Sequence, residues 1–343
     1  MSLSHGEPLS LPDRPLGRVV RSVIGYSLLT ALMIITPMLV FVPAALLHCA
    51  IRNGRRAAWA TLIIAVAIDA LVVALPAGAP EAANMAWAFL AAVLLAVALP
   101  SMAALPMVER GEKFGRVLAF LLVSSALGLA LTEIGSRALL DYSPFAAQVA
   151  QAEATSKEFL QIYKNAGVPS SSLQLTERGF RFGVYVLPAF ILAQMVMVFI
   201  LSLLMLGRLR AWREAVARRG DAEALGAYLF RNFSLPEWLL FAFVLGGLTP
   251  LATGMLQKVA ANALALVAFL YILQGLAIFR FLLAAMGAGA AGTMLGWLLL
   301  VFLTITGVGP LLLGVAGLFD PFFDFRRFKK RKDDSNANKS HSD

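Results

Sequence analysis

The sequence predicts an all-α protein: a polytopic bundle of transmembrane helices with about six full spans, two broken-helix hairpins and both termini in the cytoplasm. Of the 343 residues, 59% are hydrophobic and 14% are charged, whereas soluble domains carry about a quarter charged residues. Apolar runs of about twenty residues recur along the chain, and each is long enough to cross a bilayer as a helix. Because lipid offers no hydrogen bonds, nearly all of the backbone inside it must be helical.

Six apolar runs have the length and composition of full spans. They are residues 57–75, 84–106, 115–140, 181–207, 236–252 and 257–285. Two further runs, 23–50 and 290–319, are interrupted by residues that break helices: Pro37, Pro43, Gly307, Gly309 and Pro310. Each interrupted run is compatible with one kinked helix or with a hairpin of two short helices.

The distribution of basic residues favours the hairpins. With two hairpins and a cytoplasmic N-terminus, most of the 29 Lys and Arg face the cytoplasm, as the positive-inside rule requires. The segments concerned are 1–22, 51–56, 107–116, 208–235 and 320–343. Whether each hairpin crosses fully or is re-entrant stays open, because arms of about twelve to fifteen residues are short for a span.

This topology divides the chain into a cytoplasmic N-terminal tail (1–22), one transmembrane domain (23–319) and a basic cytoplasmic tail (320–343). Within the domain, the outer loop 141–180 carries a weak apolar stripe, which predicts either a short helix on the outer surface or a solvated linker helix. The inner loop 208–235 continues the preceding span and holds six Arg against three carboxylates. That excess suits an anionic lipid surface better than nucleic acid, because no aromatic pattern for base stacking accompanies it.

Signatures of catalysis are missing from the sequence. We find no phosphate-binding loop ending in Gly-Lys-Ser/Thr, no His-Glu-x-x-His, no Gly-x-Ser-x-Gly and no Cys-x-x-Cys. Cys49 is the only cysteine, and His48 beside it points to a different side of a helix. We therefore expect no enzyme, no metal site and no cofactor.

Polar residues inside apolar runs are the candidate site, since burying them in lipid requires a partner or water. Asp69 lies within "AVAIDALVVAL" and is either an inward-facing functional group or a structural partner of another helix. Asn262, Tyr271 and Gln274 lie in the run 257–285, with Tyr271 and Gln274 on one helix face. Such amides serve as a ligand site or, more commonly, as hydrogen-bonding contacts between helices.

Two further groups of charged residues have structural interpretations. Glu133 and Arg137 are four residues apart, the spacing at which oppositely charged side chains pair on one helix face. Near the C-terminus, "GLFDPFFDFRRFKKRK" alternates aromatics with carboxylates before a basic run. We expect Pro321 to turn the chain out of the last helix, so that the tail anchors at the inner interface. The residues assigned to this anchor are Asp320, Asp324, Arg326 and Arg327.

Several stretches of the second half resemble one known family. "GRLRAW", "FSLPEWLLFAFVLGG", "NALALVAFLYILQGLAIFRF" and "GLFDPFFDFRRF" are similar to the YybS-like family of predicted bacterial membrane proteins, which carry a domain of unknown function numbered 2232. The resemblance is sharpest over residues 230–328. It implies a multi-pass protein of the bacterial inner membrane and supplies no activity, cofactor or catalytic residues.

Two functions of different classes compete. Buried Asp69, Asn262 and Gln274, together with broken helices near both ends, favour a protein that binds or transports a small solute or ion. The alternative is a non-transporting scaffold or assembly protein that acts through its basic inner loop and tail. The partners we expect are anionic headgroups at the cytoplasmic face and a further membrane protein, with no nucleic acid.

Overall fold

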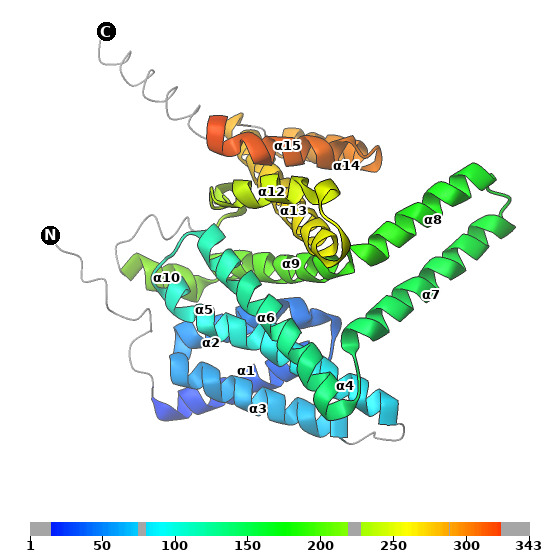
Figure 1. The fold of residues 1–343 in the computed structure, drawn as a ribbon. Coiled ribbons are helices and arrows are strands. Elements are labelled where there is room, and N and C mark those ends of the chain that lie inside the picture. The colour runs from blue at the N-terminus through cyan, green and yellow to red at the C-terminus, as the bar shows by residue number, and fades with distance from the viewer. Residues whose placement is uncertain (1–14, 75–79, 219–227, 288, 324–343) are drawn as a thin grey trace, which may run out of the picture. The chain divides into compact units, whose positions relative to one another are not determined.

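The computed structural model describes residues 15–74, 80–218, 228–287 and 289–323, and within these ranges it contains helices and turns but no strand (Figure 1). The chain forms two compact units, residues 1–227 and 228–343. The prediction of an all-α membrane protein with several spans is confirmed.

The first unit holds most of the helices. In chain order they are α1 (Leu16–Ile34), the 3-10 turn η1 (Pro37–Phe41), α2 (Val42–Asn53), α3 (Arg55–Ala74), α4 (Pro80–Val93), the π-helical turn η2 (Leu94–Ala98), α5 (Leu99–Glu109), α6 (Phe114–Leu140), α7 (Pro144–Asn165), α8 (Ser170–Tyr185), α9 (Leu187–Arg208) and α10 (Arg210–Arg218).

Six of the described helices are long and apolar enough to cross a membrane. They are Leu16–Ile34, Arg55–Ala74, Ala82–Glu109, Phe114–Leu140, Leu187–Arg208 and Gly254–Ala285. Five of them coincide with spans expected from the sequence, and the sixth is α1.

The run 23–50 is divided into two helices, as the hairpin interpretation expects, but the two arms are unequal. The chain breaks at Thr36, which is extended (φ −118°, ψ 167°) and accepts a hydrogen bond from the backbone N–H of Met38. The first arm begins at Leu16 rather than at residue 23, directly after Pro15, and is 19 residues long. These seven additional residues are about two turns, so α1 reaches the length of a span.

The span Ala82–Glu109 contains a widened turn. Pro100 lacks an N–H and its ring would clash with the carbonyl four residues earlier in a regular helix. The π-helical turn η2 lies immediately before it. Against this turn lies Gly128 of α6, where a Cβ atom would come 2.1 Å from the Leu95 carbonyl oxygen. Only glycine therefore permits this approach of α6.

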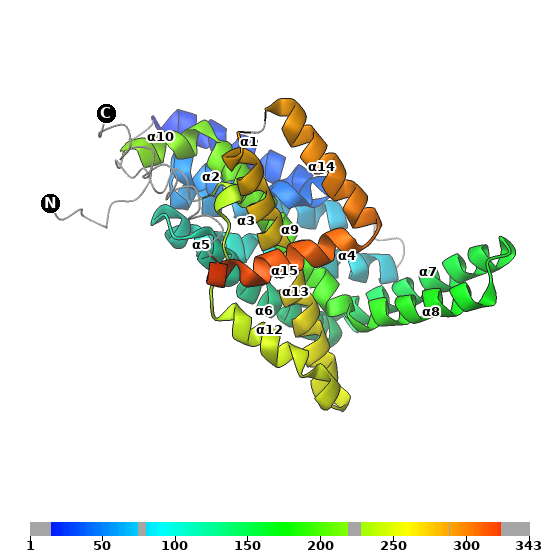
Figure 2. The same cartoon turned by 90° about the horizontal axis from the view of Figure 1, so that it is seen from above.

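The outer segment 141–180 forms two helices where one short helix was expected. Helices α7 and α8 run side by side and extend away from the rest of the first unit in both views (Figures 1 and 2). Phe159 and Phe180 stack between them, with ring centroids 6.2 Å apart. The following span begins at Leu187 rather than at residue 181, because α8 continues to Tyr185 and Pro188 opens α9.

Helix α10 is separate from α9, contrary to the expected continuous helix. Leu209 is extended (ψ 137°), which ends α9 at Arg208. Helix α10 then turns Trp212, Ala215 and Val216 inward, and all three are buried. It packs on α2 and α9, so this segment is a short amphipathic helix lying against the bundle.

The second unit consists of η3 (Phe230–Asn232), α12 (Leu239–Gly247), η4 (Thr249–Leu251), α13 (Gly254–Ala285), α14 (Ala290–Ile305) and α15 (Val308–Phe323). The expectation of a full span at 236–252 is wrong, since α12 has nine residues and is about 14 Å long. It ends at Gly246 and Gly247, shortly before Pro250, and these residues do not sustain a helix. The run 290–319 forms two helices bent by 109° at their junction, in agreement with the hairpin interpretation.

Candidate functional site

Asp69 lies on α3 within a span and is almost fully buried. Its exposed fraction is 1%, and neither carboxylate oxygen has a hydrogen-bond partner among the described residues. Leu62 and Ala65, which share its helix face, are buried as well. A carboxylate in such surroundings is unfavourable unless it carries a proton or meets a cation or water.

Six polar side chains of α1, α2 and α3 form hydrogen-bonded pairs between these helices. Tyr26 Oη lies 2.9 Å from His48 Nδ1, and Cys49 Sγ lies 3.4 Å from Thr61 Oγ1. Asn53 donates from Nδ2 to Ser22 Oγ (2.9 Å) and to Cys49 Sγ (3.7 Å). We call Ser22, Tyr26, His48, Cys49, Asn53 and Thr61 the polar ladder. It joins the three helices that pack on one another.

The polar ladder begins at the end of the first unit where arginines gather. The bond between Asn53, the last residue of α2, and Ser22, early in α1, places the start of α3 near the start of α1. At the same end, Arg55 donates from Nε to Glu109 Oε2 (3.1 Å) and forms an ion pair with it. Helices α1 and α3 therefore run in the same direction from this end. Asp69 is 14 residues beyond Arg55, a rise of about 21 Å.

Thr30 is a further buried polar residue of α1. It is fully buried, and its hydroxyl oxygen has no hydrogen-bond partner within the described part of the chain. It follows Tyr26 by one turn on α1, the helix packed along α3. Helices α1 and α3, which pack on one another, thus each carry one buried oxygen-bearing group, Thr30 and Asp69, without a hydrogen-bond partner in the described residues.

In the second unit, Gln274 connects three elements. Its Nε2 donates to Asp320 Oδ2 of α15 (2.9 Å), and its Oε1 accepts from the backbone N–H of Leu235 (3.0 Å). Tyr271, one turn before Gln274, is also buried and meets Phe243 edge-on at 5.7 Å. These contacts fit the role of hydrogen bonding between helices, which was one of the two open interpretations of Gln274.

Asp320 was expected in the tail anchor and instead lies inside α15. The helix continues through Pro321 to Phe323, and the Asp320 side chain is buried against Gln274. A proline in a final helical turn leaves few hydrogen bonds to lose, so it did not end the helix where expected. Asp324, Arg326 and Arg327, the other anchor residues, lie outside the described residues.

Asn262 does not join Gln274 and Tyr271. Its Nδ2 donates to the carbonyl oxygen of Lys258 on its own helix (2.9 Å), and it precedes Gln274 by 12 residues, about 18 Å along α13. Asp69 belongs to the first unit, whereas Asn262, Tyr271 and Gln274 belong to the second. The four residues expected to form one polar site are therefore divided between the units.

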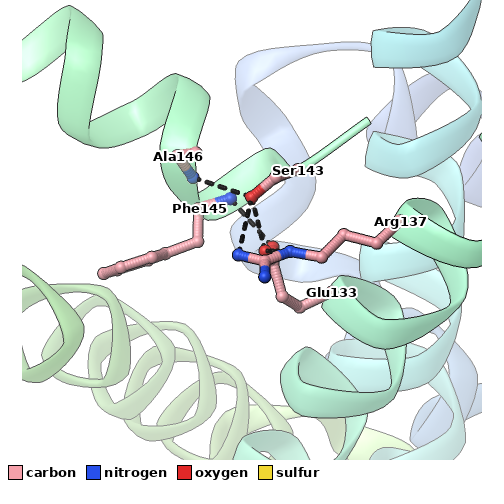
Figure 3. A network of polar contacts seen from close by, with 5 residues as sticks. All are labelled: Glu133, Arg137, Ser143, Phe145 and Ala146. Atoms are coloured by element: carbon pink, nitrogen blue, oxygen red, sulfur yellow. Dashed lines mark hydrogen bonds and ion pairs between the residues drawn. The ribbon is translucent and has the colours of Figure 1, made fainter. Parts of the chain in front are cut away.

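Glu133 and Arg137 form an ion pair that also fixes the start of α7 (Figure 3). Arg137 Nε donates to Glu133 Oε1 at 2.6 Å, and Glu133 Oε2 accepts from the backbone N–H of Phe145 at 3.0 Å. Ser143 donates to Glu133, accepts from Arg137, and caps α7 through the N–H of Ala146. This compact network satisfies both charges locally and explains why they occur at the end of a span.

The polar ladder was not predicted as a unit. The signal for it is present on two helices: Ser22, Tyr26 and Thr30 recur every four residues on α1, and Thr61 and Asp69 are two such intervals apart on α3. Residues four apart share a helix face, so each helix has a polar stripe. The sequence alone does not show that the two helices with these stripes pack together. Within the described residues, no three acidic, His or Cys side chains are grouped as a metal would require.

The fold and the apolar spans define the protein as a multi-pass α-helical membrane protein. More particularly, the family model described as "Predicted membrane protein (DUF2232)" matches residues 22–321. The chain therefore belongs to this family, as its resemblance to the YybS-like proteins implied. No curated protein and no solved structure matches the chain.

Proposed function

We propose that this protein binds and transports a small solute or ion across the bacterial inner membrane, with Asp69 as its proton-binding group. The observation that supports this most strongly is the burial of the Asp69 carboxyl group, without a hydrogen-bond partner in the described residues, inside a span. Ionisable groups at membrane depth are rare, and they typically belong to ion or proton pathways.

A proton suits Asp69 better than a metal cation does. A metal cation bound by oxygen ligands needs about six of them, whereas one carboxylate oxygen is enough to hold a proton. On α1 and α3, the buried side-chain oxygens without a hydrogen-bond partner among the described residues are the two of the Asp69 carboxyl and that of the Thr30 hydroxyl. We therefore place Asp69 in the protonated form at rest, releasing its proton when the site opens to water.

The alternative, a scaffold or assembly protein, is supported by the arginines at one end of the first unit. Those with exposed side chains are Arg18, Arg21, Arg52, Arg55, Arg56, Arg110, Arg116, Arg208, Arg210 and Arg213. We propose that these arginines contact anionic headgroups at the cytoplasmic face. That contact is compatible with transport, and a buried carboxyl without a hydrogen-bond partner in the described residues is better explained by transport than by a scaffold. We accordingly prefer transport and propose no catalytic role.

The test uses protons as the probe. Purified protein is reconstituted into liposomes that contain a pH-sensitive dye, and a potassium gradient with valinomycin sets the membrane potential. We expect proton entry about tenfold or more above that of protein-free liposomes, and entry at the protein-free level for Asp69→Asn. The matched control is Glu133→Gln, which removes a carboxylate near a span end and should retain the flux. Equal flux in the wild type and Asp69→Asn would overturn the proposal.

A further inference from the structure

We infer that the polar ladder carries protons between the arginine-rich end of the first unit and Asp69. This inference rests on the proposed function of Asp69 and adds the route by which its proton arrives. The side chains of the ladder span three helices, and none of them is needed to pair a charge. The hydroxyl, thiol and imidazole groups of the ladder can each donate and accept a hydrogen bond, whereas the Asn53 amide donates to Ser22 and Cys49 and orients them.

The arrangement along the helices supports a route. On α1, Ser22, Tyr26 and Thr30 succeed one another at intervals of four residues; on α3, Thr61 and Asp69 lie eight residues apart on one face. Since α1 and α3 run in the same direction and pack together, the two stripes progress from the same end. The polar ladder lies along the first part of this path, next to the arginine-rich end. Along the second part, Thr30 comes before Asp69.

The hydrogen bonds supply the links at the entrance. The Asn53 amide donates from Nδ2 to both Ser22 (2.9 Å) and Cys49 (3.7 Å) and so holds these two groups in place. The Cys49 thiol and the Thr61 hydroxyl, either of which can be the donor, are 3.4 Å apart. One turn deeper on α1, the Tyr26 hydroxyl lies 2.9 Å from His48 Nδ1. Thr61 and Asp69 are separated by a rise of about 12 Å along α3. Water that enters when the helices part, together with the Thr30 hydroxyl, completes the route over this distance.

His48 is the imidazole of the polar ladder, and its two ring nitrogens allow a proton to be taken up at one and released at the other. A proton added at Nε2 of the neutral imidazole gives the cation, and release of the Nδ1 proton to the Tyr26 oxygen restores neutrality. Tyr26 passes its own hydroxyl proton onward, and the Asp69 carboxylate accepts one proton to become a neutral carboxyl. One proton enters, one proton is stored, and no other bond is broken.

The experiment compares Tyr26→Phe and His48→Gln with the wild type in the liposome assay. We expect each variant to lower the proton flux by at least about tenfold. A second readout is reaction of Asp69 with dicyclohexylcarbodiimide, an apolar reagent that adds to a protonated carboxyl and rearranges to a stable N-acylurea. The adduct, located by mass spectrometry, should form on Asp69 in both variants to the wild-type extent.

The control is Tyr185→Phe, which removes a hydroxyl at the end of α8, outside the polar ladder, and should keep the wild-type flux. If Tyr26→Phe and His48→Gln conduct protons like the wild type while Asp69→Asn does not, the route is wrong and the function of Asp69 stands. If both flux and carbodiimide labelling are lost, the ladder only holds the helices together and the route is also wrong. If the wild type carries no protons at all, the proposed function itself fails.

Discussion

At the scale of single residues, Asp69 is the position where stability and function oppose each other. A buried polar group without a hydrogen bond costs about 1–3 kcal/mol in proteins, and Asp69 has no partner among the described residues. Its nearest buried neighbours on this side of α3, Leu62 and Ala65, are both apolar. A residue that serves only the fold would be expected to be apolar here, which is the reason for assigning Asp69 to function.

This argument predicts the effect of Asp69→Leu on stability. Removing the buried carboxyl should leave the free energy of unfolding unchanged or raise it, by up to about 1–3 kcal/mol, while proton flux is lost. The measurement is thermal unfolding in a mild detergent, followed by the fluorescence of the native tryptophans. The control is Glu109→Leu, which removes the buried partner of the partly exposed Arg55 and should lower the melting temperature. A clear loss of stability in Asp69→Leu would show instead that Asp69 is a structural partner.

At the scale of helices, the spans could be predicted well and their breaks could not. Length and hydropathy identified five spans, because a bilayer imposes the same constraint on every crossing segment. The run 236–252 is equally apolar, yet Gly246, Gly247 and Pro250 limit its helix to nine residues. Pro321 was expected to end α15 but lies within it. The effect of a glycine or proline depends on the helix packed against it, which hydropathy does not record.

The same reason explains which parts of the candidate site were missed. Asp69 and Gln274 were recognised because a polar residue within an apolar run stands out. The polar ladder was missed because Ser22 and Asn53 lie outside the expected apolar run 23–50 and Tyr26 lies near its start, where polar residues are common. Their significance depends on which helices pack together, and the contacts between α1, α2 and α3 supply that information.

In the second unit, glycines allow α13 and α15 to cross closely. A Cβ atom on Gly275 would lie 1.9 Å from the Leu313 carbonyl oxygen, and one on Gly317 would lie 2.0 Å from the Tyr271 carbonyl oxygen. Both clashing atoms belong to the backbone, which cannot move away as a flexible side chain can. The close approach also brings Gln274 within hydrogen-bonding distance of Asp320, so the polar contact depends on the glycines.

We therefore predict that Gly317→Ala destabilises the second unit by about 1–3 kcal/mol, the usual cost of overpacking. The matched control on the same helix is Gly314→Ala, where the nearest atom, in the Ile272 side chain, is at an ordinary 3.6 Å. Thermal unfolding in detergent should separate the two variants. Equal melting temperatures would mean that α13 and α15 do not approach as closely as described.

At the scale of the whole molecule, the charges predict how the chain is oriented in the membrane. Exposed arginines gather at the end of the first unit where α1, α3 and α6 begin and α2, α5 and α9 end. The α7–α8 hairpin follows the opposite end of α6. Because basic segments remain in the cytoplasm, the hairpin should be outside.

This orientation can be tested with single cysteines introduced into a Cys49→Ala chain. In intact cells, a membrane-impermeant maleimide should label Lys157→Cys on α7, whereas Arg56→Cys at the start of α3 should be labelled only after the membrane is permeabilised. Labelling of Arg56→Cys in intact cells would reverse the orientation of the first unit and contradict the hairpin interpretation of the run 23–50.

The central claim is that Asp69 holds a proton inside the membrane and can release it. Infrared spectroscopy of the protein in lipid tests this directly, because a protonated carboxyl in apolar surroundings has a C=O stretching band that a carboxylate lacks. We predict that the wild type shows this band at neutral pH, loses it reversibly as the pH is raised, and that Asp69→Asn lacks it throughout. Identical spectra of the two proteins in this region at every pH would contradict the claim.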